Sequence, residues 1–156
     1  LMWRAVDLKT GDLRVEQQVR SIVNGAPVVS ELKTASAYRT IKLPAPVVKV
    51  LQRHRAAMFA EGFSAHPYVF LSPAGNVYDR KAVSKRFHKL SKAVGVLRFH
   101  DLRHTAITLL LQAGEPVGVV AARAGHAKAS MTLDVYGHVL PGDDQKAADK
   151  LEEILK

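Results

Sequence analysis

The feature that most constrains the fold of this chain is a change of periodicity at Pro44 and Pro46. Before these prolines, the segment 12–43 is rich in Val, Ile, Thr and Tyr, and it is interrupted by Asn24-Gly25 and by a small polar cluster, Thr-Ala-Ser. Such interruptions between β-branched runs indicate hairpins. We therefore predict one small antiparallel sheet, with strands near residues 13–22, 27–31 and 38–43.

Helical spacing replaces strand spacing after the prolines. Proline suits the first turn of a helix, and apolar residues from Val47 to Phe59 then recur at roughly 3.6-residue spacing, up to a stop at Gly62. Similar patterns predict further helices over residues 79–94, 101–113, 116–124, 130–138 and 145–155. With 47% hydrophobic residues in 156, the chain has material for one core. We predict a mainly helical α+β fold in a single domain, residues 1–156.

The helix predicted to begin at Asp79 has two distinct faces. Val83, Phe87, Leu90 and Val94 form an apolar stripe on a helical wheel. The opposite face is basic, with Arg86 at its flank, and consists of Lys81, Lys85, Lys89 and Lys92. Two interpretations stay open, because a lysine face is either a solvated surface or a surface laid against DNA phosphates.

The charge balance favours a polyanionic partner. Lys and Arg exceed Asp and Glu by 23 − 14 = +9. Cysteine is absent, which excludes disulfides and thiolate metal sites and gives no indication of an oxidising compartment. Apolar runs are too short for a spanning helix or a signal-peptide core. We expect a soluble, cytoplasmic protein, and we interpret the start at Leu1 as the start of a fragment.

The stretch RFHDLRHTAITLLLQAG, residues 98–114, concentrates polar side chains at a predicted helix start. Asp101 suits the first turn, where backbone N–H groups are exposed. Residues three apart share a helix side, so His100 and Arg103 are able to address one small anion together. The wheel predicts a core-facing side made of Leu102, Ala106, Leu109, Leu110 and Ala113.

A pair H-x-x-R is weak evidence alone, and two later residues strengthen it. His126 follows a glycine and adds another donor, while Tyr136, ten residues further on, adds an oxygen nucleophile. A single tyrosine of this kind is more often half-buried packing. The hypothesis therefore depends on the whole set in its order along the chain.

That order resembles the tyrosine recombinase, or phage integrase, family. The matching segments are HDLRHT, AARAGH and TLDVYGHV, and the upstream segment ELKTASAYRTIKLP resembles the family's hairpin with an active-site lysine, here Lys33. The resemblance covers essentially the whole chain. It implies the helical catalytic domain of that family, with a three-stranded sheet near the N-terminus, and a role in DNA recombination and integration by mobile elements.

The resemblance implies a role for each residue. Tyr136 attacks a phosphodiester of double-stranded DNA, giving a 3′-phosphotyrosine and a free 5′-hydroxyl. Arg103 holds a non-bridging oxygen, His100 and His126 donate or relay protons, and Lys33 protonates the leaving oxygen. His104 and His138 are expected to support these groups. No cofactor or ATP is expected, because the phosphotyrosine conserves the bond energy for rejoining.

One departure from the family concerns what precedes Leu1. The family uses another arginine, which by this register falls upstream of the first residue, and an N-terminal DNA-clamping domain. Neither is in this sequence, so we expect the isolated fragment to bind DNA weakly and to cleave poorly or not at all. The resemblance also implies a homotetramer on DNA and a monomer in isolation.

Two other interpretations compete with this one. The histidines of HDLRH, His100 and His104, have the i, i+4 spacing of zinc-binding helices, and His126 or His138 would complete a metallohydrolase site. Asp101 is shorter than the glutamate base that such a site requires. The second alternative is a DNA-binding module without catalysis, built on the basic helix of residues 79–94.

Overall fold

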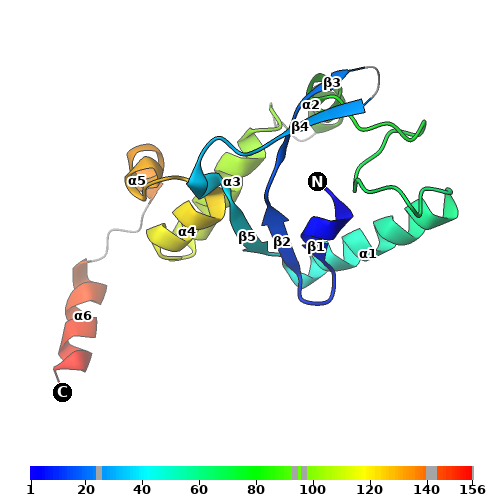
Figure 1. The fold of residues 1–156 in the computed structure, drawn as a ribbon. Helices are drawn as coiled ribbons and strands as arrows, with labels where there is room; N and C mark the ends of the chain where they lie inside the picture. The colour runs from blue at the N-terminus through cyan, green and yellow to red at the C-terminus, as the bar shows by residue number, and fades with distance from the viewer. Residues whose placement is uncertain (24–25, 93–94, 96–97, 140–143, 156) are drawn as a thin grey trace.

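The computed structural model describes residues 1–23, 26–92, 95, 98–139 and 144–155. A β-rich N-terminal part is followed by helices, and the chain ends on a helix that stands apart from the rest (Figure 1). This arrangement confirms the predicted mainly helical α+β class with a small antiparallel sheet near the N-terminus.

A three-stranded antiparallel sheet is formed in the order β1-β2-β5. Its strands are β1 (Val6–Asp7), β2 (Asp12–Val15) and β5 (Arg39–Lys42). Leu13 lies opposite both Val6 and Ile41 in the register. One face of the sheet contributes to an apolar cluster whose buried members are Val6, Leu51 and Val69, and this cluster anchors the N-terminal part.

The remaining strands form a separate antiparallel ribbon of β3 (Gln18–Val23) and β4 (Ala26–Ser30). The predicted hairpin between the run 13–22 and the strand near residues 27–31 is confirmed by the pairing of β3 with β4. The predicted single sheet is wrong, because the run 13–22 is divided between two sheets and, among the described residues, β4 pairs with β3 and not with β5. The valines of the ribbon are largely exposed, whereas β2 and β5 reach the core. Local composition predicts strands but not which strands share a core. The predicted turn Asn24-Gly25 lies outside the described residues.

The helices of the N-terminal part begin as predicted. α1 (Ala45–Ala60) follows Pro44 and buries Leu51 and Met58. α2 (Arg80–Ser91) is capped by Asp79, whose carboxylate accepts a hydrogen bond of 2.7 Å from the backbone N–H of Lys81. α2 itself ends at Ser91, and Val94, the predicted end of its apolar stripe, lies outside the described residues. Short 3-10 turns occupy Trp3–Ala5 and Ala35–Ala37.

A second apolar cluster holds the C-terminal helices together. α3 (Asp101–Gln112), α4 (Val117–Ala124) and α5 (Ser130–Tyr136) pack on one another, and a 3-10 turn, η4 (Gly137–Val139), follows. The buried members of this cluster are Ile107, Leu111, Val120, Ala124 and Tyr136.

The predicted core face of α3 is wrong except for Leu110, which packs against the cluster. Leu109 is 60% exposed and Leu102 is 44% exposed, whereas Ile107 and Leu111 are buried. Because α3 is apolar on several sides, its hydrophobic pattern does not fix its rotation. The rotation is set by His104, Ile107 and Leu111, which share one side of the helix and all face Tyr136 or its cluster.

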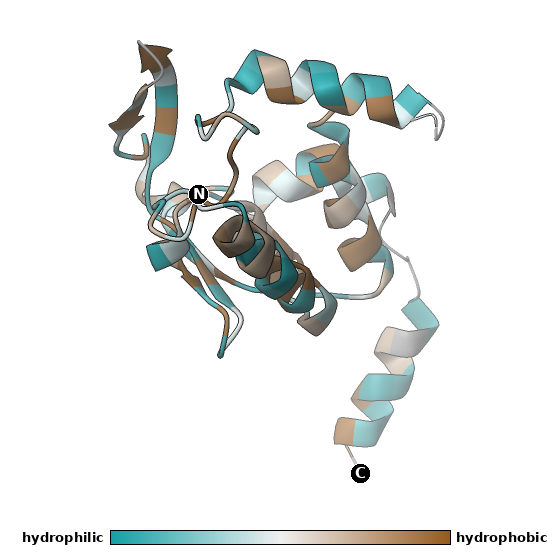
Figure 2. Ribbon diagram, turned by 90° about the vertical axis from the view of Figure 1, so that its right-hand side faces the viewer, coloured by the Kyte–Doolittle hydropathy of each residue, from teal (hydrophilic) through white to brown (hydrophobic). Residues whose placement is uncertain are grey.

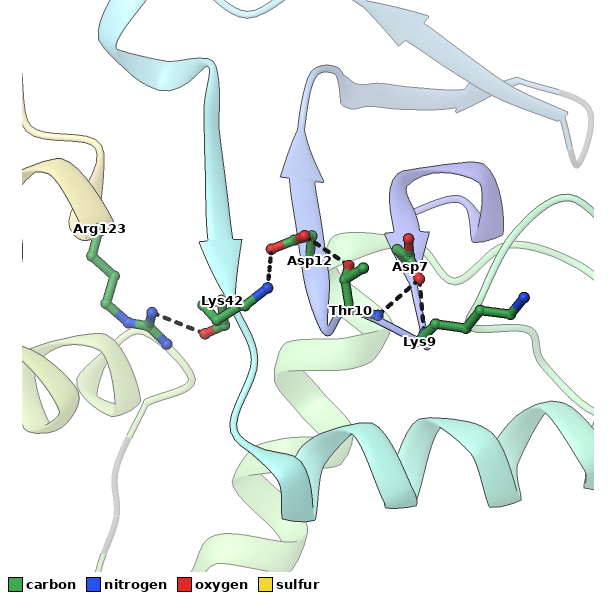
Figure 3. A network of polar contacts seen from close by, with 6 residues as sticks. All are labelled: Asp7, Lys9, Thr10, Asp12, Lys42 and Arg123. Atoms are coloured by element: carbon green, nitrogen blue, oxygen red, sulfur yellow. Dashed lines mark hydrogen bonds and ion pairs between the residues drawn. The ribbon is translucent and has the colours of Figure 1, made fainter.

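Two arginines join the sheet to the helical part. Arg123, near the end of α4, donates from Nη1 to the carbonyl oxygen of Lys42 at 3.1 Å, and Lys42 pairs with Asp12 across the sheet (Figure 3). The carbonyl oxygen of Arg123 in turn accepts a hydrogen bond of 3.0 Å from Nε of Arg39. The edge strand β5 is therefore tied to the end of α4, where the predicted Gly-His motif lies.

The last helix, α6 (Asp144–Ile154), projects away from the other elements in both ribbon views (Figures 1 and 2). Apolar positions on α6 are open to solvent, including Ile154, which is 73% exposed, and Leu155 just beyond the helix, which is 83% exposed. The helix does not fold back onto the core. Across the described ranges, no helix combines the length and the apolar character needed to cross a membrane.

Candidate active site around Tyr136

The structure brings Arg103, His104, His126 and Tyr136 together from three parts of the helical region. Arg103 and His104 lie in the first turn of α3, His126 follows the end of α4, and Tyr136 ends α5. The common packing of these three helices fixes the mutual positions of the four side chains.

Arg103 is anchored at the end of α4. Its Nη2 donates to the carbonyl oxygen of Ala124 at 2.5 Å. A guanidinium has five N–H donors in a planar fork, so this contact leaves further donors for an anionic ligand. Arg103 is therefore both a structural link and a cation available to a phosphate.

Tyr136 is a buried neutral phenol in this structure. It is 6% exposed and belongs to the apolar cluster of α3, α4 and α5. Burial raises the pKa of its hydroxyl, while the nearby Arg103 acts in the opposite direction. The hydroxyl contacts Nδ1 of His104, so His104 is the group placed directly at the oxygen that would react.

His126 follows Gly125, which closes α4 in the left-handed conformation with φ 78°. Nδ1 of His126 lies 2.8 Å from Oγ1 of Thr132 on α5. Burial lowers the pKa of His126, and the positive charges of Arg103 and Arg39 lower it further. The ring is therefore held neutral and one of its nitrogens is already engaged.

Arg39 is a cation of this site that the sequence analysis missed. Its guanidinium lies close to the backbone of Gly125. If residue 125 carried a Cβ atom, that atom would lie 2.8 Å from Nη1 of Arg39. Burial lowers the pKa of Arg39, and the charge of Arg103 lowers it further. Within the described ranges neither arginine pairs with a carboxylate, so the site carries uncompensated positive charge and favours an anion.

No local pattern in the sequence could have identified Arg39. Arg39 lies 84 positions from Arg123, whose carbonyl it contacts, and its segment reads as an ordinary strand. Thr132 is one turn before Tyr136 on the same side of α5, and this i, i+4 spacing is the one available signal.

Other predicted residues lie at the edge of the site or outside it. His100 immediately precedes α3, and its ring meets that of His104 edge to face at a centroid distance of 5.0 Å. His138 is exposed in η4. Lys33 is exposed in the segment between β4 and β5, rather than at a hairpin tip, because these strands do not pair. It has no side-chain hydrogen bond to the described part of the chain.

The basic face of α2 is open to solvent. Its residues Lys81, Lys85, Arg86, Lys89 and Lys92 are all exposed. Arg86 donates to the hydroxyl of Tyr78 at 3.3 Å. The four lysines make no ion pair with any residue that the structure describes. The face thus presents positive charge that no described carboxylate neutralises.

The geometry does not support the zinc alternative. Among the residues described, no three His, Cys, Asp or Glu side chains are grouped so that they could hold a metal ion. The carboxylate of Asp101 is already engaged by Arg98. It forms an ion pair of 3.0 Å with the guanidinium of Arg98 and accepts a hydrogen bond of 2.9 Å from the backbone N–H of Arg98. Arg98 lowers the pKa of this carboxyl.

Comparison with known proteins establishes the family. The model of the phage integrase family matches residues 2–142, and the chain therefore belongs to this family. It is 27% identical to a tyrosine recombinase XerC-like protein of Caldanaerobacter subterraneus over 99% of the chain and 44% of that protein. It is 30% identical to the ICEBs1 integrase of Bacillus subtilis, also over 99% of the chain and 44% of that protein.

Solved structures share the fold. The Tn1549 transposon integrase, in complex with transposon right end DNA, matches with a TM-score of 0.75 and 21% identity, over 100% of this chain and 53% of that chain. XerA recombinase matches with a TM-score of 0.67 and 19% identity, over 98% of this chain and 50% of that chain. The chain thus spans about half the length of the proteins it matches.

Proposed function

We propose that the protein is a site-specific DNA recombinase, or integrase, that cuts and rejoins DNA strands through a 3′-phosphotyrosine. The observation that carries this proposal is the convergence of Arg103 from α3, His126 from the turn after α4 and Tyr136 from α5 on one positively charged site. A guanidinium, an imidazole and a phenol are the groups required to bind a phosphodiester and displace one of its oxygens.

In the proposed reaction, the oxygen of Tyr136 forms a bond to phosphorus as the bond from phosphorus to the 5′ oxygen breaks. Arg103 holds a non-bridging oxygen, and His100 and His126 donate to the same group. Lys33 protonates the leaving 5′ oxygen. Rejoining is the reverse attack by a 5′-hydroxyl, so the exchange needs no cofactor.

The phenol must lose a proton that it holds tightly. The contact between its hydroxyl and Nδ1 of His104 supports His104 as the first acceptor of that proton. Because Tyr136 is packed into the apolar cluster, we infer that its hydroxyl moves toward the phosphate when DNA binds. The exposed position of Lys33 is consistent with a residue that also reaches the site on DNA binding.

We propose that Lys81, Lys85, Arg86, Lys89 and Lys92 contact the phosphates of double-stranded recombination sites. Their exposure, with no carboxylate of the described residues paired to them, supports this. The open apolar residues at the end of α6 support assembly, and we propose a homotetramer on DNA formed from monomers. The protein would act where its DNA is, in the bacterial cytoplasm at the nucleoid, on a phage or another mobile element.

A nicked half-site that cannot religate tests the proposal. The protein at its full encoded length should form a DNA adduct that survives denaturation, and Tyr136→Phe should form none while still binding the half-site. DNA binding without any adduct in the unsubstituted protein would favour the alternative of a binding module without catalysis. An adduct that persists in Tyr136→Phe would show that another nucleophile acts.

A further inference from the structure

Thr132 is a buried polar side chain that the proposed reaction leaves without a role. It is 0% exposed, and its Oγ1 lies 2.8 Å from Nδ1 of His126. Buried hydroxyl groups usually have a hydrogen-bond partner, and this imidazole is the partner that the structure gives Thr132.

The contact decides which nitrogen of His126 can reach a ligand. Nδ1 is occupied by Thr132, so Nε2 is the nitrogen available to a phosphate. A neutral imidazole has one N–H donor and one bare acceptor nitrogen, and a hydroxyl is able to serve either. If the hydroxyl donates to Nδ1, the proton of the ring is on Nε2, which then donates to the phosphate.

The charge around His126 makes this choice of tautomer important. Burial, Arg103 and Arg39 all lower the pKa of His126, so the ring is uncharged near neutral pH. A cationic imidazole donates from both nitrogens whatever its partner, but a neutral one donates from only one. A carboxylate in place of the hydroxyl would instead stabilise the charged ring.

We propose that Thr132 is a positioning residue for phosphate recognition: its hydroxyl donates to Nδ1 of His126 and so keeps the ring proton on Nε2, aimed at a non-bridging phosphate oxygen. This inference rests on the proposed function of the site. Thr132 and Tyr136 are one turn apart on α5. The same hydrogen bond therefore couples the helix of the nucleophile to the Gly125-His126 turn, and it would align both with one phosphorus atom.

The tautomer is tested directly by NMR of the ring nitrogens of His126 in the protein at full encoded length, assigned by comparison with His126→Gln. Above the pKa of the ring, we expect a protonated Nε2 and a bare, hydrogen-bonded Nδ1. Finding the proton on Nδ1 would overturn the proposal, because Nε2 could then only accept.

A matched pair of substitutions tests the functional consequence. Thr132→Val keeps the shape of the side chain but removes the hydroxyl, and it should slow adduct formation on the nicked half-site. Partners that orient a functional histidine contribute about 10- to 100-fold in metal sites, and we expect a decrease of that order. The Kd for DNA should change little, and Thr132→Ser, which keeps the hydroxyl, should restore most of the rate. An unchanged rate in Thr132→Val would overturn the proposal.

A double-mutant cycle separates positioning from packing. If Thr132 acts through His126, Thr132→Val should cause no further decrease in the rate of His126→Ala. A further decrease would mean that Thr132 acts through the core, which contradicts the proposal.

The outcomes also distinguish this inference from the function on which it rests. An unchanged rate in His126→Ala would remove His126 from the reaction, and the inference with it. An adduct in Tyr136→Phe would overturn the proposed nucleophile, while the NMR result would still decide whether Thr132 sets the tautomer.

Discussion

The helical part around Tyr136 and the strand segment around Lys33 hold their functional side chains in opposite ways. In the helical part, Arg103, His104 and His126 each have a hydrogen-bond partner, and Tyr136 is packed among apolar side chains. Lys33, by contrast, is exposed, and its side chain makes no hydrogen bond to a described residue. Under the proposed function, the phosphate-binding side of the site would be preformed, whereas the leaving-group side would be completed by DNA.

Among the substitutions that test this difference, Arg103→Ala is expected to have the largest effect on the rate of adduct formation. Arg103→Ala should reduce the rate of adduct formation roughly 100- to 1000-fold, since donors aimed at developing charge contribute about that much. It should also lower the free energy of unfolding by about 1 kcal/mol, because the carbonyl of Ala124 loses its donor. Single-turnover kinetics and urea unfolding measure the two effects. Loss of activity with unchanged stability would argue that the guanidinium is not part of a preformed framework.

Lys33→Ala should lower the rate of DNA cleavage without changing the stability of the fold. We expect a decrease of about 100-fold in cleavage, comparable with the loss of other aimed donors. The unfolding midpoint should stay the same, because Lys33 makes no side-chain hydrogen bond to a described residue. A nicked substrate whose 5′ leaving group is a thiol, which leaves without protonation, should restore the rate. Absence of this rescue would contradict the assignment of Lys33 as the acid.

A smaller effect is expected at Gly125, which the guanidinium of Arg39 approaches. Gly125→Ala introduces a side chain at φ 78° and places Cβ 2.8 Å from Nη1 of Arg39. A left-handed conformation alone costs a non-glycine residue about 1–2 kcal/mol. Gly118, in α4, has no atom within 4 Å of a Cβ position, so Gly118→Ala is a matched control that should stabilise by about 0.5 kcal/mol. Equal effects of the two substitutions, measured by urea unfolding, would contradict the close approach of Arg39.

The smallest expected effect is a pH dependence of stability. His126 has a lowered pKa in the folded state because of burial, Arg103 and Arg39, so the unfolded chain binds its proton first. The free energy of unfolding should therefore fall as the pH drops through the ordinary value of 6.5, and the loss is complete below the folded pKa. His126→Gln should flatten the curve measured by urea unfolding between about pH 5 and 8. An unchanged slope would show that His126 is not held neutral.

The sequence predicted elements better than their packing. Pro44 and Asp79 marked helix starts correctly, since caps and proline geometry act over a few residues. The expectation that residues 27–31 join the same sheet as residues 38–43 was wrong, and the inward side of α3 was wrong for Leu109. Which strands and which helix side share a core is decided by packing across the fold. Arg39 escaped detection because its partner Arg123 lies 84 positions away, whereas Thr132, which contacts the nearby His126, had only its i, i+4 spacing to Tyr136 as a signal.

What the sequence determined by itself was the chemical inventory and its order: a basic, cysteine-free chain with His100, Arg103, His126 and Tyr136 at spacings that resemble one family. Only the tertiary structure decided that Tyr136 is buried against His104, that Thr132 occupies Nδ1 of His126, and that Arg39 joins the site from the sheet. Local steric and capping preferences are encoded over a few neighbouring residues. Burial, tautomer and charge density depend on side chains that meet only when the helices and the sheet pack together.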